Sequence, residues 1–522
     1  FTKSFEYSFA VNDKIGTSFL ENNQAYINNY EQIVKSITPE DISKAAQKYL
    51  NLNKAAITVI HPQNISKETI HSNYSNEKQI AFRGNKKEPV NLKNVKMYNL
   101  PNNLKVITND TKTDNTYINI NFNCDDYANT SPAAALILDA MLNEGTINKP
   151  QEQFDFEIAK NGVKSEATAT AASLSVFMNS GSEDMDKALK AAKEIIYSPR
   201  FTQETFEYVK GLLKDSLLTE EKSANDKLEQ ELYKNLPYGY SKEDILKDLK
   251  TITLDDIKKL YNYLMTNAKA DIEVSGPFSK KPELNNILFS ELSLMPKVKE
   301  FSPIKLTNSF TPIEKTKVLT DTDYRNQAEI IMAYKFKSNG NLKDTVTLEL
   351  LNKILGGGPS SRLFNDLREK EKLAYSVRST YNRIDDIGTL KLKIGTTTEN
   401  NETGEISYDN VQKSIEGFKR HIADLKAQKV SEEELNNAKL SLKNEILSFN
   451  EGASGKISSL SLGVASPYGI SKQNQYFEMI DTISVKDLNN AANYIFSGNP
   501  VYSILATKNT LDANNDYLSN LN

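Results

Sequence analysis

A capped helix that leads into a β-rich run occurs three times in this sequence and limits the folds open to it. Each copy carries Thr or Ser at the expected N-cap and Asp three residues later, a capping box with negative charge in the first turn: Thr38 and Asp41, Thr253 and Asp256, Ser484 and Asp487. The runs that follow are Ala55–Ile60, Ala270–Val274 and Val501–Ala506. Three unrelated capped helices are the alternative, but the wide spacing favours whole domains of common ancestry.

The repeat divides the chain into domains that each close with one copy. Residues 1–62 are expected to be the end of a domain whose beginning is absent, and residues 63–92, rich in Asn, Lys, Ser and Glu, are typical of a linker. A complete domain is expected at 93–278, a proline-containing linker at 279–317 and a last domain at 318–522. We also expect the true start of the polypeptide to lie upstream of Phe1.

Within each complete domain the expected order is strands, helices, strands, and then the capped helix with a final strand. Val95–Leu100 and Leu104–Thr108 flank a Pro-Asn-Asn turn and predict a hairpin, and Ser131 followed by Pro132 predicts the start of a helix. Further helices are expected at Asp184–Tyr197, Gln203–Leu218, Leu342–Leu355 and Tyr408–Ala427, and strands at Ala328–Tyr334 and Gly388–Ile394. The mixture predicts an α+β fold, with a mainly antiparallel sheet packed against helices in each domain.

Composition excludes several classes of function. The 64 basic and 68 acidic residues are mixed along the chain and give a net charge of −4, so a nucleic-acid partner is not expected. The single cysteine, Cys124, follows an alternating run and is typical of a small core residue. No apolar run approaches the roughly 20 residues that span a bilayer, so no membrane span is expected.

The sequence lacks the ligands of a self-contained zinc site. Such a site needs imidazole and carboxylate ligands, whereas the histidines are His61, His71 and His421, and none belongs to an H-E-x-x-H or H-x-x-E-H motif. Each is expected to be structural or on the surface. The Gly356–Arg362 turn lacks the Gly-Lys-Ser/Thr ending of a P-loop, and no Gly-x-Ser-x-Gly elbow is present. We therefore expect no metal-binding residues in this chain.

A longer segment carries a specific resemblance. Residues 355–364, Leu-Gly-Gly-Gly-Pro-Ser-Ser-Arg-Leu-Phe, followed by Leu-Arg and then Leu-Ala-Tyr, resemble the C-terminal half of pitrilysin/insulinase-like (inverzincin) zinc metallopeptidases. In that family an Arg and a Tyr seven residues later hold the substrate carbonyl and stabilise the oxyanion. The matching residues are Arg368 and Tyr375, and the resemblance also implies that the turn of Gly356, Gly357 and Gly358 binds substrate.

The alternative for the Arg and Tyr pair is purely structural. Arg368 has three acidic neighbours in sequence, Asp366, Glu369 and Glu371, with which it could pair on a solvated face. Tyr375 could be one core tyrosine among 25.

The preceding domain resembles the same family in a degraded form. Leu136, Asp139 and Ala140 occupy the His, Glu and His positions of its H-x-x-E-H helix, and the third zinc ligand, a Glu, would fall near Asp215. Apolar side chains cannot coordinate zinc, so the resemblance implies an inactive domain. Residues Ser165–Thr170 match the edge strand that binds substrate in the family's active domain, and here we expect them only to line a chamber.

The resemblance implies that this chain is the C-terminal half of a four-domain clamshell endopeptidase. An N-terminal half, in the same polypeptide or a partner subunit, would hold the zinc, and together they would degrade unfolded peptides in an enclosed chamber. This chain alone would be inactive. The alternative is a non-catalytic scaffold or peptide-binding subunit of the same fold. The compartment stays open, although similar four-domain bacterial proteins favour the periplasm.

Overall fold

The computed structural model describes residues 8–20, 24–50, 88–234, 236–305, 308–400 and 404–521. They belong to two compact units, Phe1–Arg83 and Gly84–Asn522. The described part of the first unit contains α1 (Ser8–Leu20), α2 (Gln24–Ser36) and α3 (Pro39–Tyr49). Helix α3 follows Thr38, whose backbone N–H and hydroxyl both donate to Asp41, which confirms the first capping box. The run Ala55–Ile60, His61, His71 and most of the expected linker lie outside the described residues.

The second unit holds two successive sets of strands and helices. The first set is β1 (Val95–Asn99), β2 (Lys105–Asp110), β3 (Asn115–Asn123), α4 (Ala134–Met141), β4 (Gly145–Thr146), β5 (Lys149–Pro150), α5 (Gln151–Lys160), β6 (Lys164–Ala169), β7 (Ser173–Gly181), α6 (Met185–Tyr197), α7 (Gln203–Thr219), α8 (Ala224–Leu232), α9 (Lys242–Asp248), α10 (Leu254–Asn267), β8 (Lys269–Gly276) and α11 (Glu283–Ser293). The second set is β9 (Lys317–Thr322), β10 (Gln327–Lys337), α12 (Leu342–Leu355), a π-helix (Phe364–Lys370), β11 (Ala374–Ile384), β12 (Ile387–Thr397), α13 (Asn410–Lys426), α14 (Glu432–Phe449), α15 (Ala453–Val464), α16 (Lys472–Thr482), α17 (Val485–Ile495), β13 (Val501–Ala506), α18 (Lys508–Ala513) and α19 (Asn515–Ser519).

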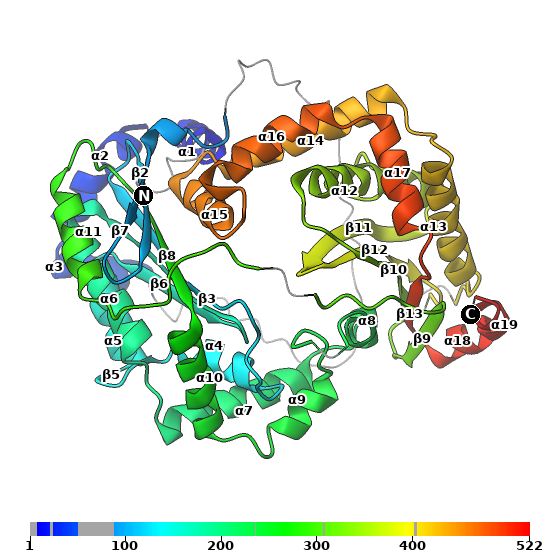
Figure 1. The fold of residues 1–522 in the computed structure, drawn as a ribbon, viewed down its shortest axis with the longest axis horizontal. Coiled ribbons are helices and arrows are strands. Elements are labelled where there is room, and N and C mark those ends of the chain that lie inside the picture. Colours follow the sequence, from blue (N-terminus) through cyan, green and yellow to red (C-terminus); the bar gives the residue numbers. More distant parts are fainter. Residues whose placement is uncertain are drawn as a thin grey trace. The chain divides into compact units, whose positions relative to one another are not determined.

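The two large sheets of this unit share one topology (Figure 1). The first has strand order β1-β2-β8-β3-β7-β6 and the second has β9-β13-β10-β12-β11 when read from the equivalent side. In each, the strand after the capped helix pairs in parallel with one neighbour and antiparallel with the other, and the remaining pairs are antiparallel. The sequence repeat is therefore a repeat of topology, and the predicted α+β fold with mainly antiparallel sheets is confirmed.

Helices from the same half of the sequence cover one face of each sheet. In the first sheet, Ile118 and Ile272 pack with Leu138 of α4 and Leu260 of α10. In the second, Met332 and Leu392 belong to a core that includes residues of α12, α13 and α17. Full burial of such a side chain contributes about 1.5–3 kcal/mol, so these faces are a main source of stability.

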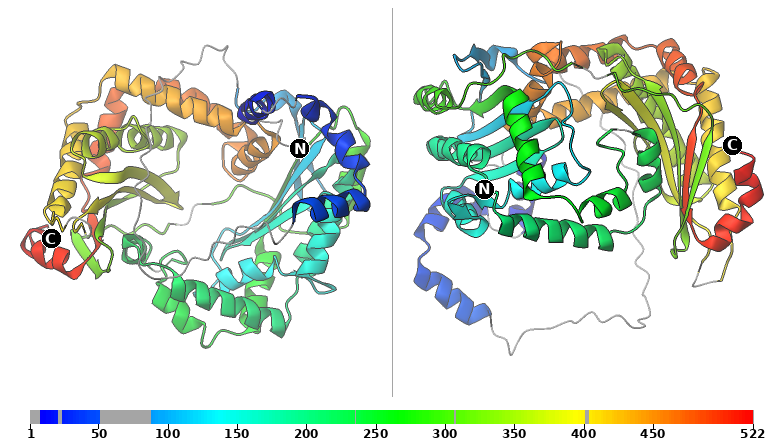
Figure 2. Two further views of the ribbon diagram at one scale, coloured as in Figure 1. Left: turned by 180° about the vertical axis from the view of Figure 1, so that it is seen from behind. Right: turned by 60° about the horizontal axis from the view of Figure 1, so that its bottom comes forward.

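A helix from the other half of the sequence covers the opposite face of each sheet. Helix α15 lies on β8 and β3 of the first sheet and buries Ile457 and Leu460 there. Helix α8 lies on β10 and β13 of the second sheet and buries Leu228 and Leu232. The right-hand view of Figure 2 shows α8 and α13 on opposite faces of the second sheet. This exchange buries every residue of β8, which is covered on both faces.

Most predicted elements are confirmed with shifts of a few residues. The hairpin forms between β1 and β2, and Asn103 has a φ of 67° in its turn. The capping boxes of α10 and α17 are present, and Cys124 is buried. The prediction that Ser131 caps the next helix is wrong, because α4 begins at Ala134.

The cap of α4 comes from a distant carboxylate. The backbone N–H of Ala133 donates to Asp248, at the end of α9, over 2.9 Å, while the hydroxyl of Ser131 is buried and has no hydrogen-bond partner among the described residues. A local sequence pattern cannot reveal a cap supplied by a residue so far along the chain.

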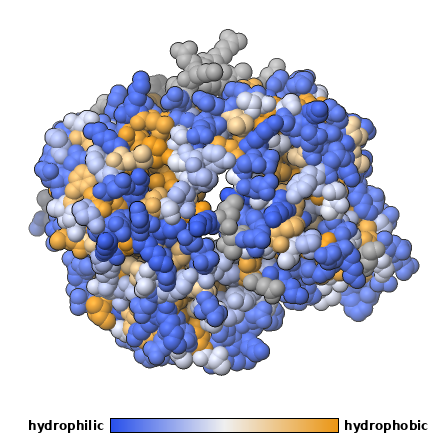
Figure 3. Space-filling view, in the orientation of Figure 1, coloured by the Kyte–Doolittle hydropathy of each residue, from blue (hydrophilic) through white to orange (hydrophobic). Residues whose placement is uncertain are grey.

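Hydrophilic side chains cover most of the face displayed in Figure 3. Among the described residues, no helix combines the length and apolar character needed to cross a membrane.

Candidate active-site residues and family membership

The segment that carries Arg368 and Tyr375 is irregular in three places. It begins as the π-helix Phe364–Lys370, and Lys372 then adopts a left-handed conformation with a φ of 55°. The pairing of β11 with β12 shifts between Ala374 and Ser376, so Tyr375 lies at a β-bulge. π-Helices and bulges are frequent at functional sites because they redirect side chains.

These irregularities place Arg368 beside Tyr375. The guanidinium Cζ lies 5.1 Å from the centroid of the Tyr375 ring and 4.5 Å from that of Phe364. A cation over an aromatic face is attracted by the negative potential of the ring. Tyr375 is 80% exposed, so it is not a core residue and its phenol is accessible.

The acidic neighbours of Arg368 are mostly engaged elsewhere. Glu369 lies 3.5 Å from Nε of Arg368 and is half exposed, so this pair contributes about 0–1 kcal/mol. Asp366 and Glu371 instead bind Arg420 over 2.7 and 2.6 Å. A purely structural role of Arg368 is therefore supported by one weak ion pair, with Glu369.

Helix α13 anchors the π-helix. His421 is buried on α13, as expected for a structural histidine, and its Nε2 lies 2.8 Å from Asp366. Burial lowers the pKa of His421, and the Asp366 carboxylate opposes that shift. A Cβ on Gly417 would lie 2.4 Å from Leu367, so the glycine lets the π-helix pack closely. These contacts fix the turn that presents Arg368.

The three glycines after α12 have different surroundings. Gly356 accepts a 3.0 Å hydrogen bond from the backbone of Ser379 in β11, and a Cβ there would lie 2.3 Å from that nitrogen. A Cβ on Gly357 would lie 2.8 Å from Cα of Lys353, whereas one on Gly358 would meet nothing within 4 Å. Close packing accounts for the first two, and the expected substrate contact of Gly356–Gly358 stays a prediction.

Side chains at the end of α4 occupy the free edge of β6. Asn143 accepts from the backbone N–H of Ala167 over 3.0 Å and donates to its carbonyl over 2.8 Å. Asp139 accepts from the N–H of Ala169 over 2.8 Å. Burial raises the pKa of Asp139, and the Ala169 N–H opposes that shift. An added strand would need these same backbone groups, so the edge is closed at residues 167–169.

Two family descriptions match this chain. Residues 109–244 match the insulinase family (peptidase family M16), and residues 251–442 match the peptidase M16 inactive domain. The chain belongs to the insulinase-like M16 family. The non-peptidase homolog YmxG of Helicobacter pylori is 26% identical over 361 residues, which cover 67% of this chain and 78% of that protein. An uncharacterized zinc protease of Rickettsia felis is 27% identical over 328 residues, which cover 60% of this chain and 73% of that protein.

Solved structures share the M16 fold at low sequence identity. A protease from Helicobacter pylori superposes with a TM-score of 0.67 at 19% identity, covering 79% of this chain and 99% of that chain. The periplasmic protease PqqL from Escherichia coli gives a TM-score of 0.61 at 14% identity, and the match covers 92% of this chain and 52% of the PqqL chain.

The residues at the M16 zinc-motif positions of this chain do not fit a zinc ion. Leu136 and Ala140 stand at its histidine positions on α4, and Asp139 is bound to the edge of β6. Asp215 is exposed on α7. Leu and Ala have no donor atoms for zinc. In the parts of the chain that the structure describes, no three His, Cys, Asp or Glu side chains gather to hold a metal.

A buried carboxyl pair on β8 was not among the residues predicted from the sequence. The amide nitrogen of Asn121 lies 3.0 Å from a carboxyl oxygen of Asp271, from one of Glu273 and from the hydroxyl of Ser461 on α15. Burial raises the pKa of both carboxyls, and the neighbouring Asp271 charge raises that of Glu273 further. The sequence signal was the alternation of Lys269, Asp271 and Glu273 with apolar residues in a central strand.

Proposed function

We propose that this chain is the zinc-free half of an M16 endopeptidase and that it supplies Arg368 and Tyr375 to the transition state. The observation that carries the proposal is the exposed phenol held beside a guanidinium by a π-helix and a bulge. Peptide hydrolysis develops negative charge on the carbonyl oxygen, and a preorganised donor aimed at that charge contributes about 2.7–4 kcal/mol.

The two side chains have distinct roles in this proposal. Tyr375 donates its O–H to the oxyanion, because its hydroxyl is accessible and its backbone is fixed in β11. Arg368 positions the ring and offers its remaining N–H groups to the substrate carbonyl, because Glu369, its ion-pair partner among the described residues, is weakly bound and half exposed. Zinc, which would activate the attacking water, must be held by another half, because the motif positions of α4 offer no ligands.

The size of a relative supports the division into halves. This chain covers 52% of the chain of PqqL, which is called a periplasmic protease. An N-terminal zinc-bearing half, in the same polypeptide or in a partner subunit, would complete a chamber for unfolded peptides. The expected domain boundaries at 93–278 and 318–522 stay part of this proposal.

The second candidate is a non-catalytic scaffold or peptide-binding subunit. The closed edge of β6 favours it, because the peptide-pairing groups of Ala167 and Ala169 are occupied. The H. pylori relative is also named a non-peptidase homolog. In this case Arg368 and Tyr375 would hold a peptide carbonyl without hydrolysis.

Metal content and cleavage separate the two candidates. The natively purified species should be analysed for intact mass and zinc, and then assayed on quenched fluorescent peptides with and without a chelator. A species of about twice this chain's mass, with one zinc and chelator-sensitive cleavage, supports the endopeptidase. A zinc-free species that cleaves nothing with its natural partner present leaves the scaffold.

A further inference from the structure

A basic pocket opens on the second sheet, and Ser376, the residue after Tyr375, lines it. Its volume is about 300 Å³, and residues of β10, β11 and β12 line it together with the turn before β10. Its charged lining residues are Arg325, Glu329, Arg378 and Lys393, three cations and one anion. We propose that this pocket binds a carboxylate of the peptide, an inference that rests on the proposed function.

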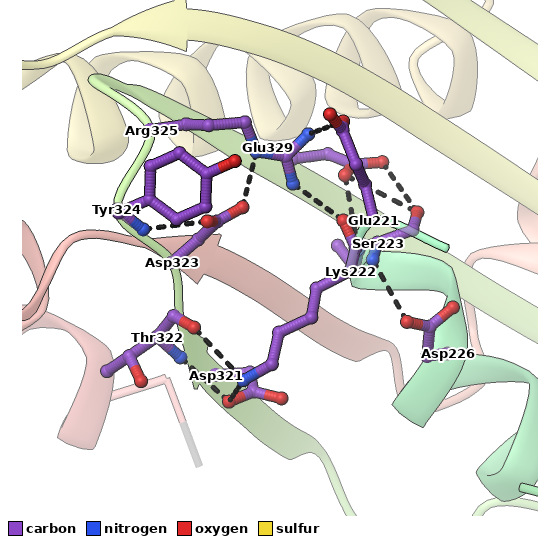
Figure 4. A network of polar contacts seen from close by, with 11 residues as sticks. Glu221, Lys222, Ser223, Asp226, Asp321, Thr322, Asp323, Tyr324, Arg325 and Glu329 are labelled. Atoms are coloured by element: carbon purple, nitrogen blue, oxygen red, sulfur yellow. Dashed lines mark hydrogen bonds and ion pairs between the residues drawn. The ribbon is translucent and has the colours of Figure 1, made fainter. Parts of the chain in front are cut away.

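The one anion in the lining is fully engaged. Glu329 accepts from the hydroxyl of Ser223 over 3.1 Å (Figure 4). It also accepts from the N–H of Ala224, at the start of α8, over 3.2 Å. It also pairs with Lys393. Burial raises the pKa of Glu329, but Lys393 and the α8 donors outweigh burial and hold it below its usual range. Glu329 therefore serves the docking of α8 and neutralises Lys393.

Arg325 is engaged as well. Its guanidinium pairs with Asp323, lies 3.2 Å from Glu221 and donates to the carbonyl of Lys222 over 2.6 Å (Figure 4). These contacts join the turn before β10 to the chain segment that precedes α8. Two of the three cations in the pocket thus have carboxylate partners.

Arg378 is the third cation of the pocket. It is exposed on β11, and among the described residues no carboxylate lies within ion-pair distance of it. Ser376, two residues earlier on the same strand, lines the same pocket with a hydroxyl group. A guanidinium fork binds a carboxylate through two parallel hydrogen bonds, and the hydroxyl can add a third.

The position of the pocket defines its ligand. Ser376 directly follows Tyr375, and an extended peptide advances about 3.3 Å per residue. A peptide whose carbonyl contacts Tyr375 therefore brings a carboxylate within one or two residues of that carbonyl to Arg378. An acidic side chain and a C-terminal carboxylate share this chemistry.

The test compares peptides that differ by one charge on the complete protein. One pair carries Glu or Gln beside the cleaved bond with an amidated C-terminus, and a second pair has a free or amidated C-terminus at the same distance. We expect kcat/KM to favour the charged member of one pair by about 10-fold or more. Arg378→Gln should abolish the preference, while Arg383→Gln, an exposed arginine of the same strand, should retain it. Which pair shows the preference identifies the carboxylate.

Measurements of peptide binding test the pocket independently of catalysis. The same labelled peptides are titrated against chelated complete protein and followed by fluorescence anisotropy, and thermal unfolding checks that each variant is folded. If nothing is cleaved but an Arg378-dependent preference in Kd is present, the pocket stands and the peptidase proposal fails. No charge preference in Kd or kcat/KM, or a preference that survives Arg378→Gln, overturns the pocket.

Discussion

The guanidinium of Arg368 lies over the ring of Tyr375, with 5.1 Å between Cζ and the ring centroid. The two residues belong to different elements, and the contact depends on the π-helix, on Lys372 with its φ of 55° and on the bulge at Tyr375. A change that moves β11 against α12 should therefore displace the phenol without altering its chemistry.

Gly356→Ala is such a change. The new Cβ would lie 2.3 Å from the backbone nitrogen of Ser379 and 2.8 Å from its hydroxyl oxygen. Overpacking of this kind costs about 1–3 kcal/mol, so urea unfolding should show a loss of that size. Gly358→Ala is the matched control, because its Cβ meets nothing within 4 Å, and it should change stability by less than about 0.5 kcal/mol. Equal losses in the two variants would contradict the packing of Gly356 against β11.

Asn143→Ala should open the edge of β6. The substitution removes both hydrogen bonds to Ala167 and leaves its N–H and carbonyl without partners. We expect the Ala167 amide to exchange with deuterium about 10-fold faster or more, because the local opening energy falls. Asn161→Ala is the control, since that side chain donates to the carbonyl of Glu157 at the end of α5. Unchanged exchange at Ala167 would show that the side chain does not protect this edge.

The carboxyl pair on β8 should make stability depend on pH. Burial raises the pKa of Asp271 and Glu273 in the folded chain, so their stabilising contribution is fully present below the ordinary carboxyl pKa near 4. It is lost as pH rises through the folded values. The facing polar side chains, Asn121, Asn123 and Ser461, carry no charge that could offset ionisation of both carboxyls.

The double variant Asp271→Asn, Glu273→Gln isolates this effect. Between about pH 4 and 8 the wild type should lose free energy of unfolding relative to the variant, by up to about 1.4 kcal/mol per pH unit for each proton retained. Urea unfolding of both proteins across this range measures the difference. A difference that is the same at every pH would mean that the pair does not hold an extra proton when folded.

Local patterns in the sequence predicted the parts of the fold that local chemistry decides. The capping boxes of α3, α10 and α17 each depend on residues three positions apart, and the β1–β2 hairpin depends on its own turn. The exchange of α8 and α15 between the sheets could not be predicted in this way. The residues that meet, such as Asn121 and Ser461, are hundreds of positions apart.

The same distinction applies to the candidate site. The Arg368 and Tyr375 pair was found because a contiguous motif carries it, and the structure brings the two side chains together. Arg378 was not singled out, because its significance depends on Glu329 and Arg325 being engaged by the segment before α8. The closure of β6 likewise depends on Asn143, which no motif had marked.

The role of Tyr375 is tested by the turnover of Tyr375→Phe in the complete, zinc-bearing protein. Loss of one oxyanion donor should lower kcat about 10²–10³-fold, with little change in KM and an unchanged midpoint of thermal unfolding. Tyr240→Phe, which alters a partly exposed tyrosine before α9, should cleave the same peptide at the wild-type rate. Wild-type turnover by Tyr375→Phe would contradict the assignment of this chain as the half that stabilises the transition state.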